Sequence, residues 1–373
     1  MHLTARLRHL GPNWYAAVMG TAIVGSAGAA LPSHVPWLCA AAWALSLLLL
    51  LLLLAARALH HTHHRDQARA HLLDPATAPF YGCAAMALLA VGGGALSAGR
   101  YWIGTPAAVA LDAVLFTAGT ALGLAAAVAV PYRMVTRHRS GLADATPVWL
   151  LPLVAPMVSA ALGPALVPYL PSGQPRETLL LGCLALFGLS LLATLLMLPL
   201  FLARLLLHGP LPLALTPTLF LVLGPLGQST TATGAIADLA PGVVPAPYDR
   251  GLAVFAVLYG VPVMGFALLW LALAAAQVVR ARRRGMRFAL TWWGLTFPVG
   301  TCVTGAASLA RHTGLTVYAG LAVGLYALLL MAWAAAATGT VRGLLSGALL
   351  PAPRPARGAL RAARVRTRSG AVR

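Results

Sequence analysis

Charged side chains are scarce in this 373-residue chain. Only 9% of the residues are charged and 60% are hydrophobic, whereas charged residues make up about a quarter of a typical soluble domain. Lysine is absent, so all 26 basic residues are arginine, and there are only seven acidic residues. This composition excludes an ordinary soluble domain, a disordered chain and a collagen-like repeat. It indicates a protein that crosses a membrane several times.

Patterns typical of disulfide scaffolds, enzymes and cofactor sites are also missing. The four cysteines lie in apolar stretches without Cys-x-x-Cys spacing, so they are expected to behave as small apolar residues. No zinc-protease motif, phosphate-binding glycine loop or nucleophile elbow occurs. We therefore expect no catalytic residues and no cofactor. The net charge of +19 comes from arginines that lie between apolar runs, so a basic face for nucleic acid is not expected either.

A histidine cluster follows the second apolar stretch. His60 and His64 are four residues apart and could share a helix face, with His61 and His63 between them. Two imidazoles do not form a closed metal site, so we expect solvated histidines beside the membrane and no bound metal. An intramembrane enzyme acting on a lipid or quinone stays as an alternative. It would need such groups within the bilayer, whereas these histidines lie at a helix end.

Ten apolar stretches divide the chain, and arginine fixes their orientation. A spanning helix needs about 20 apolar residues. The expected spans are 13–30, 36–56, 79–98, 107–131, 147–168, 178–203, 214–237, 249–279, 288–310 and 315–345. The two termini and the loops on their side contain 22 arginines, and the opposite loops contain four. Because cytoplasmic loops retain positive charge, both termini are expected in the cytoplasm.

Odd-numbered spans differ in amino-acid composition from even-numbered ones. The odd spans carry prolines, glycines and hydroxyl side chains, which need neighbouring helices or water around them, whereas the second and sixth spans are rich in leucine. We therefore expect odd helices inside and even helices outside. The prolines expected to kink the inner helices are Pro152, Pro156, Pro225 and Pro298.

Four segments in odd spans carry a family resemblance. They are GPNWYAAVMGT at 11–21, LPLVAPMVSA at 151–160, PTLFLVLGPLGQSTT at 217–231 and WWGLTFP at 292–298. Together they resemble the tellurite-resistance/dicarboxylate transporter family. That family includes bacterial tellurite-resistance channels, fungal malate transporters and sulfite exporters, and plant slow-type anion channels. The resemblance extends from Pro12 to about Leu345.

The resemblance implies an all-α membrane protein of ten helices, arranged as five tandem hairpins around a central pore. It also implies that odd helices line the pore, that three protomers associate, and that a phenylalanine of the ninth helix closes the pore. The WWGLTFP segment assigns this gate to Phe297. The alternative for this residue is an aromatic side chain packed in the core.

Neutral polar side chains are the expected ligands of a permeating anion. No charged residue lies well inside an odd span, and Asp112 and Asp238 lie near span ends. An anion would then be stabilised by weak neutral contacts, which allow release. The expected pore-lining or anion-binding residues are Thr21, Ser159, Gln228, Ser229, Thr230, Thr231, Thr233, Thr296 and Thr301. Bonding of each hydroxyl to its own helix is the alternative.

The sequence thus predicts three parts: a short cytoplasmic N-terminus (1–12), a transmembrane domain (13–345) and an arginine-rich cytoplasmic tail (346–373), expected to be disordered. We expect multi-pass insertion in the plasma membrane, the inner membrane in a bacterium, with anionic lipid headgroups at the arginine-rich side. The expected substrates are small inorganic anions, sulfite or C4-dicarboxylates such as malate. Passive flux is favoured by the lack of buried carboxylates, and a proton-coupled dicarboxylate carrier is the other possibility.

The topology predicts that Ser172 and Ser140 lie on opposite sides of the membrane. Ser172→Cys should react with an impermeant thiol reagent added outside, and Ser140→Cys should react only after permeabilisation. The four native cysteines in apolar stretches provide the unreactive background. Reaction of both variants from the same side would contradict the ten-span topology.

Overall fold

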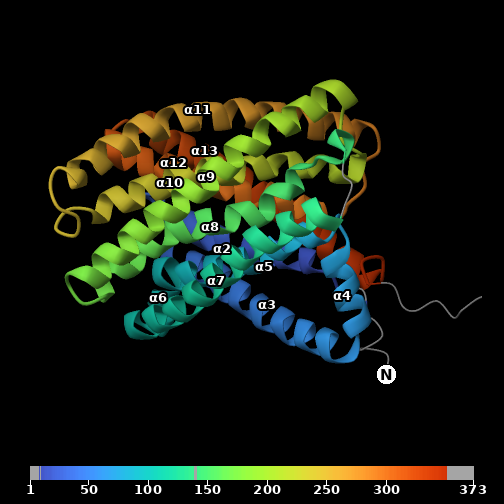
Figure 1. Ribbon diagram of the computed structural model, residues 1–373, viewed down its shortest axis with the longest axis horizontal. Helices are drawn as coiled ribbons and strands as arrows, with labels where there is room; N and C mark the ends of the chain where they lie inside the picture. Colours follow the sequence, from blue (N-terminus) through green and yellow to red (C-terminus); the bar gives the residue numbers. More distant parts are fainter. Residues whose placement is uncertain (1–7, 9, 138–140, 351–373) are drawn as a thin grey trace, which may run out of the picture.

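The computed structural model describes residues 8, 10–137 and 141–350, and every regular element within them is helical. Five long helices form the outside: α3 (Pro36–His63), α7 (Thr105–Arg137), α9 (Gln174–His208), α11 (Tyr248–Arg283) and α13 (Thr316–Leu345). Five shorter ones lie between them (Figure 1): α2 (Tyr15–Ala29), α5 (Tyr81–Gly94), α8 (Leu151–Leu162), α10 (Leu223–Leu239) and α12 (Phe297–Thr313). Most of the predicted tail lies outside the described residues.

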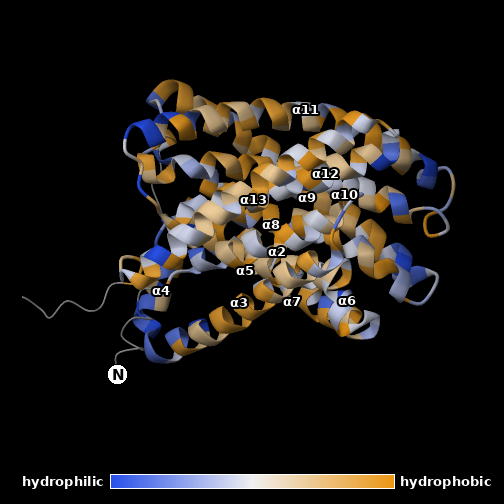
Figure 2. Cartoon of the chain, turned by 180° about the vertical axis from the view of Figure 1, so that it is seen from behind, coloured by the Kyte–Doolittle hydropathy of each residue, from blue (hydrophilic) through white to orange (hydrophobic). Residues whose placement is uncertain are grey.

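Seven of the ten expected spans correspond to stretches long and apolar enough to cross a membrane. The other three correspond to α2, α10 and α12, which have 15, 17 and 17 residues. Figure 2 shows hydrophilic residues gathered at the two ends of the bundle, with hydrophobic residues between them. This distribution fits a protein whose middle lies in a bilayer.

Burial separates the two sets of helices. In the five outer helices only 22–33% of the most apolar window is buried, whereas the value is 78% around α5 and 83% around α8. In α10 and α12, 13 and 12 of the 17 residues are buried. The expected division into an inner odd set and an outer even set is therefore what the structure has.

The inner helices form a closed ring. Contacts run from α2 to α5, from α5 to α8, from α8 to α10, from α10 to α12, and from α12 back to α2. Each inner helix also packs against the outer helix that follows it in the chain, as α2 does against α3 and α12 against α13. Glycines allow close approach: a Cβ on Gly82 of α5 would lie 2.3 Å from the carbonyl oxygen of Leu151.

Each inner α-helix is preceded by a 3₁₀ segment. These segments are η1 (Pro12–Trp14), η2 (Ala78–Phe80), η5 (Pro147–Leu150), η7 (Leu213–Val222) and η8 (Leu290–Leu295). On the opposite side, α5 continues through a π-helical turn, η3 (Ala95–Gly99), into the short α6 (Arg100–Ile103). A further short helix, α4 (Arg65–Leu73), follows α3.

The four prolines expected to kink inner helices lie at two kinds of position. Pro156 lies inside α8, but Pro152, Pro225 and Pro298 each lie in the first turn of α8, α10 and α12. The N–H groups at the start of these α-helices donate into the preceding 3₁₀ segments, as those of Leu151 and Leu223 do to the carbonyl oxygens of Val148 and Phe220. These prolines therefore lie where a 3₁₀ segment continues into an α-helix, and the kinks expected at them stay predictions.

Candidate functional site: the interior of the ring

The inward face of α12 follows from its contacts with its two ring neighbours. Gly300 packs against Ile23 of α2. The Thr301 hydroxyl lies 2.7 Å from the Pro298 carbonyl oxygen of its own helix and 3.3 Å from the carbonyl oxygens of Leu223 and Gly224 at the start of α10. Successive helical residues are about 100° apart, so Phe297 and Thr304 project between these two contact directions. These two residues therefore face the centre of the ring.

The same construction selects two residues of α10. Gly227 packs against Thr301 of α12, and the methyl group of Thr230 lies beside Gly260 of α11. Thr231 and Gln228 project in the remaining direction, which points towards the ring centre. The Thr231 and Thr304 hydroxyls are hydrogen-bonded to each other at 2.7 Å, which joins the inward faces of α10 and α12.

Two observations indicate unfilled polar space next to α10. Gln228 is only 3% exposed, yet its Oε1 has no hydrogen-bond partner. Gly224, one helical turn earlier on the same face, is buried, but a Cβ built on it would meet no atom within 4 Å. A buried amide oxygen without a partner is costly, so this position suits water or a ligand in the ring interior.

Towards the ends of the inner helices, the interior opens into a cavity of about 390 Å³. Four of the five inner chain segments contribute to its wall, which includes Ser26, Ser97, Tyr169 and Thr304. Arg100 supplies a positive charge to the same wall. The cavity therefore combines hydroxyl donors with one cation, which suits an anion. We call it the outer vestibule.

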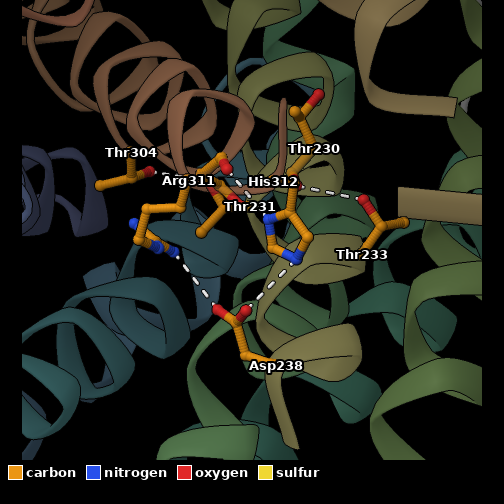
Figure 3. A network of polar contacts seen from close by, with 8 residues as sticks. Thr230, Thr231, Thr233, Asp238, Thr304, Arg311 and His312 are labelled. Atoms are coloured by element: carbon orange, nitrogen blue, oxygen red, sulfur yellow. Dashed lines mark hydrogen bonds and ion pairs between the residues drawn. The ribbon is translucent and has the colours of Figure 1, made fainter. Parts of the chain in front are cut away.

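A polar network closes the α10 and α12 ends near this vestibule (Figure 3). Asp238 of α10 lies 3.4 Å from an Arg311 guanidinium nitrogen and 3.2 Å from Nε2 of His312, both on α12. The His312 ring donates through Nδ1 to the Ser308 carbonyl oxygen at 2.9 Å. The two inner helices that meet through Thr231 and Thr304 are thus also joined at their ends.

Comparison with known proteins identifies the family. The model of the voltage-dependent anion channel family matches residues 9–341. The chain belongs to this family. A transporter of Methanocaldococcus jannaschii described as uncharacterized is 26% identical over 334 residues, covering 88% of this chain and 91% of the relative. Sulfite efflux pumps of Trichophyton rubrum and Arthroderma otae are each 30% identical, over about half of both chains.

Membership in the anion channel family decides between the classes of function. The family consists of membrane transporters and channels, so the chain is a membrane transport protein and not an enzyme. The alternative of an intramembrane enzyme is therefore set aside.

Most of the expected anion-binding residues lie between helices. Thr21 accepts a hydrogen bond at 3.1 Å from the indole of Trp333 on the outer helix α13, and Ser159 accepts one at 2.9 Å from Thr120 on α7. Thr296 lies against Gly20 of α2. Thr301 bridges α12 and α10, and the hydroxyls of Ser229, Thr230 and Thr233 donate to carbonyls of their own helix. Helical phase places Gln228 and Thr231 on the inward face, and the assignment of the other seven residues to an anion pathway stays a prediction.

The sequence did not point to the residues that line the outer vestibule. Ser26 and Ser97 are the polar members of small-residue runs late in the first and third spans, and their hydroxyls are 3.5 Å apart. Thr304 follows Phe297 by seven residues, a spacing that places both on one helix face. Helical spacing from Phe297 could have found Thr304, but Arg100 resembled an ordinary loop residue.

The structure also corrects two expectations about ionisable groups. Asp112 is not at an exposed helix end: it is 1% exposed in α7, its Oδ2 has no partner, and Gly92 of α5 lies beside it. His60, expected to be solvated, is fully buried, and its ring stacks on His71 at 5.6 Å. Within the described ranges, no group of three potential metal ligands occurs.

The inward hydroxyl pair predicts a change in selectivity. Replacing Thr231 and Thr304 by valine preserves side-chain shape and removes both hydroxyls, so relative anion permeabilities in proteoliposomes should change. The loss of stability should be about 1 kcal/mol. Thr230→Val is the matched control, because Thr230 faces α11. Permeability ratios that stay unchanged, as in the control, would contradict this assignment.

Proposed function

We propose that this protein moves small anions passively through the centre of the five-helix ring. In this proposal ten helices cross the plasma membrane as five hairpins, both termini are cytoplasmic, and three protomers associate with one pathway each. The observation that carries the proposal is the ring itself, whose centre is faced by Gln228, Thr231, Thr304 and Phe297. Neutral donors suit conduction, because a site must release what it binds.

Sulfite, small inorganic anions and C4-dicarboxylates such as malate are the candidate substrates. The similarity to sulfite efflux pumps over half the chain makes sulfite the first to test. The arginine-rich side would raise the local concentration of any of these anions by its positive potential. Arg100 in the outer vestibule would do the same at the other end of the pathway.

A proton-coupled carrier is the second candidate, and Asp112 is the observation that favours it. A buried ionisable group inside a membrane protein often belongs to a proton pathway. Asp112 contacts Gly92 of the inner helix α5, and the neighbouring Gly93 lines the outer vestibule. Its carboxyl group therefore lies directly behind the proposed pathway, although not in it.

Flux through the purified protein in liposomes tests both candidates. Chloride, nitrate, sulfite and malate should be compared, each with and without an imposed pH gradient. A passive pathway predicts that flux follows the electrochemical gradient of the anion alone. Uphill anion movement driven by the pH gradient would overturn the passive proposal in favour of coupling, and absence of flux for all four anions would overturn both.

Phe297 is proposed as the gate of this pathway. It is the first residue of α12, immediately after the break at Thr296, and it is 2% exposed. It lies on the inward face below Thr304, at the end where η8 joins α12. A wide apolar ring cannot replace the hydration shell of an anion, so it can close a narrow pathway by steric block and dewetting.

Removing the ring should open the pathway. Phe297→Ala should raise basal anion flux at near-normal yield, and Phe297→Leu should give an intermediate flux. Phe201→Ala is the control, because Phe201 is 1% exposed on the outer helix α9 and its truncation should cost about 3–5 kcal/mol of stability without raising flux. Wild-type or lower flux per assembled Phe297→Ala protein, with reduced stability, would identify Phe297 as a packing residue.

A further inference from the structure

A second cavity, of about 580 Å³, lies at the opposite end of the bundle from the outer vestibule. It lies between the last turns of the outer helices α7 and α9 and the 3₁₀ segments that start inner helices. Its wall includes Phe80, Arg137, Asp144, Trp149, Arg204 and Leu215. None of the inward-facing residues of the ring lines it, so it is distinct from the proposed pathway. We call it the arginine cavity.

Arg204 is a buried cation with no counter-charge among the described residues. Its side chain donates through Nε to the Ala143 carbonyl oxygen at 3.4 Å and through Nη1 to that of Gly209, and the residue is 8% exposed. Both acceptors are neutral. In the described part of the chain, no carboxylate oxygen lies within 4.0 Å of this guanidinium. A buried charge is strongly disfavoured unless an opposite charge compensates it.

Arg57 is a second buried arginine whose hydrogen-bond partners are neutral, but an aromatic ring lies against it. It is 5% exposed and donates to the Leu10 carbonyl oxygen at 2.7 Å and to the Tyr81 hydroxyl at 3.3 Å. Its guanidinium also lies over the Tyr81 ring, 5.9 Å from the centroid. Arg204 likewise has two neutral partners among the described residues, but it borders a cavity.

The other charged groups of the arginine cavity favour an anionic ligand. Arg137, on the last turn of α7, adds a second guanidinium. The Asp144 carboxylate accepts a hydrogen bond from the Gly141 backbone N–H at 3.0 Å and so closes its own turn. Among the described residues neither arginine has a carboxylate partner. Together with the indole of Trp149, they form a surface on which a multi-oxygen anion can make paired hydrogen bonds.

We propose that the arginine cavity binds an oxyanion of the phosphate class, held by Arg204 and Arg137. The two sources of this group are a free oxyanion and the headgroup of an anionic phospholipid. A lipid headgroup fits this position because α7 and α9 are outer helices, whose exposed faces would meet the acyl chains. In either case the anion supplies the charge that Arg204 lacks.

Thermal unfolding of the purified protein tests the site with inorganic phosphate as the probe. At constant ionic strength, phosphate should raise the midpoint saturably relative to chloride. Arg204→Gln should abolish the increase, and Arg137→Gln should weaken apparent affinity by about tenfold, the loss expected for a hydrogen bond to a charged group. Arg342→Gln is the matched control, an exposed arginine of α13 outside the cavity. If Arg204 were merely structural, Arg204→Gln would lower the baseline midpoint, and the increase caused by phosphate would stay intact in Arg137→Gln.

Native mass spectrometry from nanodiscs separates the two sources. Retention of phosphatidylglycerol, but not phosphatidylcholine, that is lost in Arg204→Gln would identify the headgroup, and phosphate stabilisation alone would identify a free oxyanion. If Arg204→Gln does not fold, Arg137→Gln and Arg204→Lys decide, since lysine keeps the charge but loses the paired donors. The proposal is overturned if neither probe binds, or if binding is undiminished in the variants. Neither readout depends on anion flux.

Discussion

The structure depends on hydrogen bonds from neighbouring side chains to the backbone of the inner helices. Inside a bilayer every backbone polar group needs a partner, and inner helices interrupted by 3₁₀ turns and prolines cannot supply all of them. Outer-helix side chains provide several: Trp270 of α11 donates to the Leu219 carbonyl oxygen at 2.9 Å, Trp43 of α3 to that of Val91 at 3.0 Å, and Ser190 of α9 to that of Leu153 at 2.6 Å. The outer helices thus stabilise the irregular backbone as well as covering it.

Contacts between neighbouring helices limit which polar side chains are available to a ligand. A hydroxyl that bonds a neighbouring helix holds the ring together, as Thr301 does at the start of α10. A hydroxyl on the inward face can instead exchange its partner, as Thr231 and Thr304 can. Polar residues of the inner helices therefore either join neighbouring helices or face the ring centre. Thr230 and Thr231 are adjacent in the chain, and only their directions on the helix distinguish these two roles.

The sequence predicted the helical class and the inner and outer sets, because proline, glycine and hydroxyl content follow directly from burial beside other helices. It did not predict the neighbours of single residues. Thr21 and Ser159 have the same polar character as Thr231, but their directions depend on where α13 and α7 pack. The role of Pro298 depended on where its helix begins, which only the 3₁₀ segment before Phe297 defines. The burial of Asp112 was not predicted because it results from packing against α5, a tertiary contact.

The five inner helices share one direction, because the 3₁₀ segments that precede them contact one another on one side of the bundle (Figure 1). Their backbone dipoles therefore add, with the positive N-terminal ends all on the side where the 3₁₀ segments lie. The 3₁₀ segments continue directly into these α-helices, since the Leu151 N–H donates to the Val148 carbonyl oxygen and the Leu223 N–H to that of Phe220. The positive ends therefore lie at the starts of the 3₁₀ segments. An anion in the ring would meet a lopsided potential well, deeper towards the helix starts. In the proposed pathway, such an asymmetric well would make the anion current depend on the sign of the applied voltage.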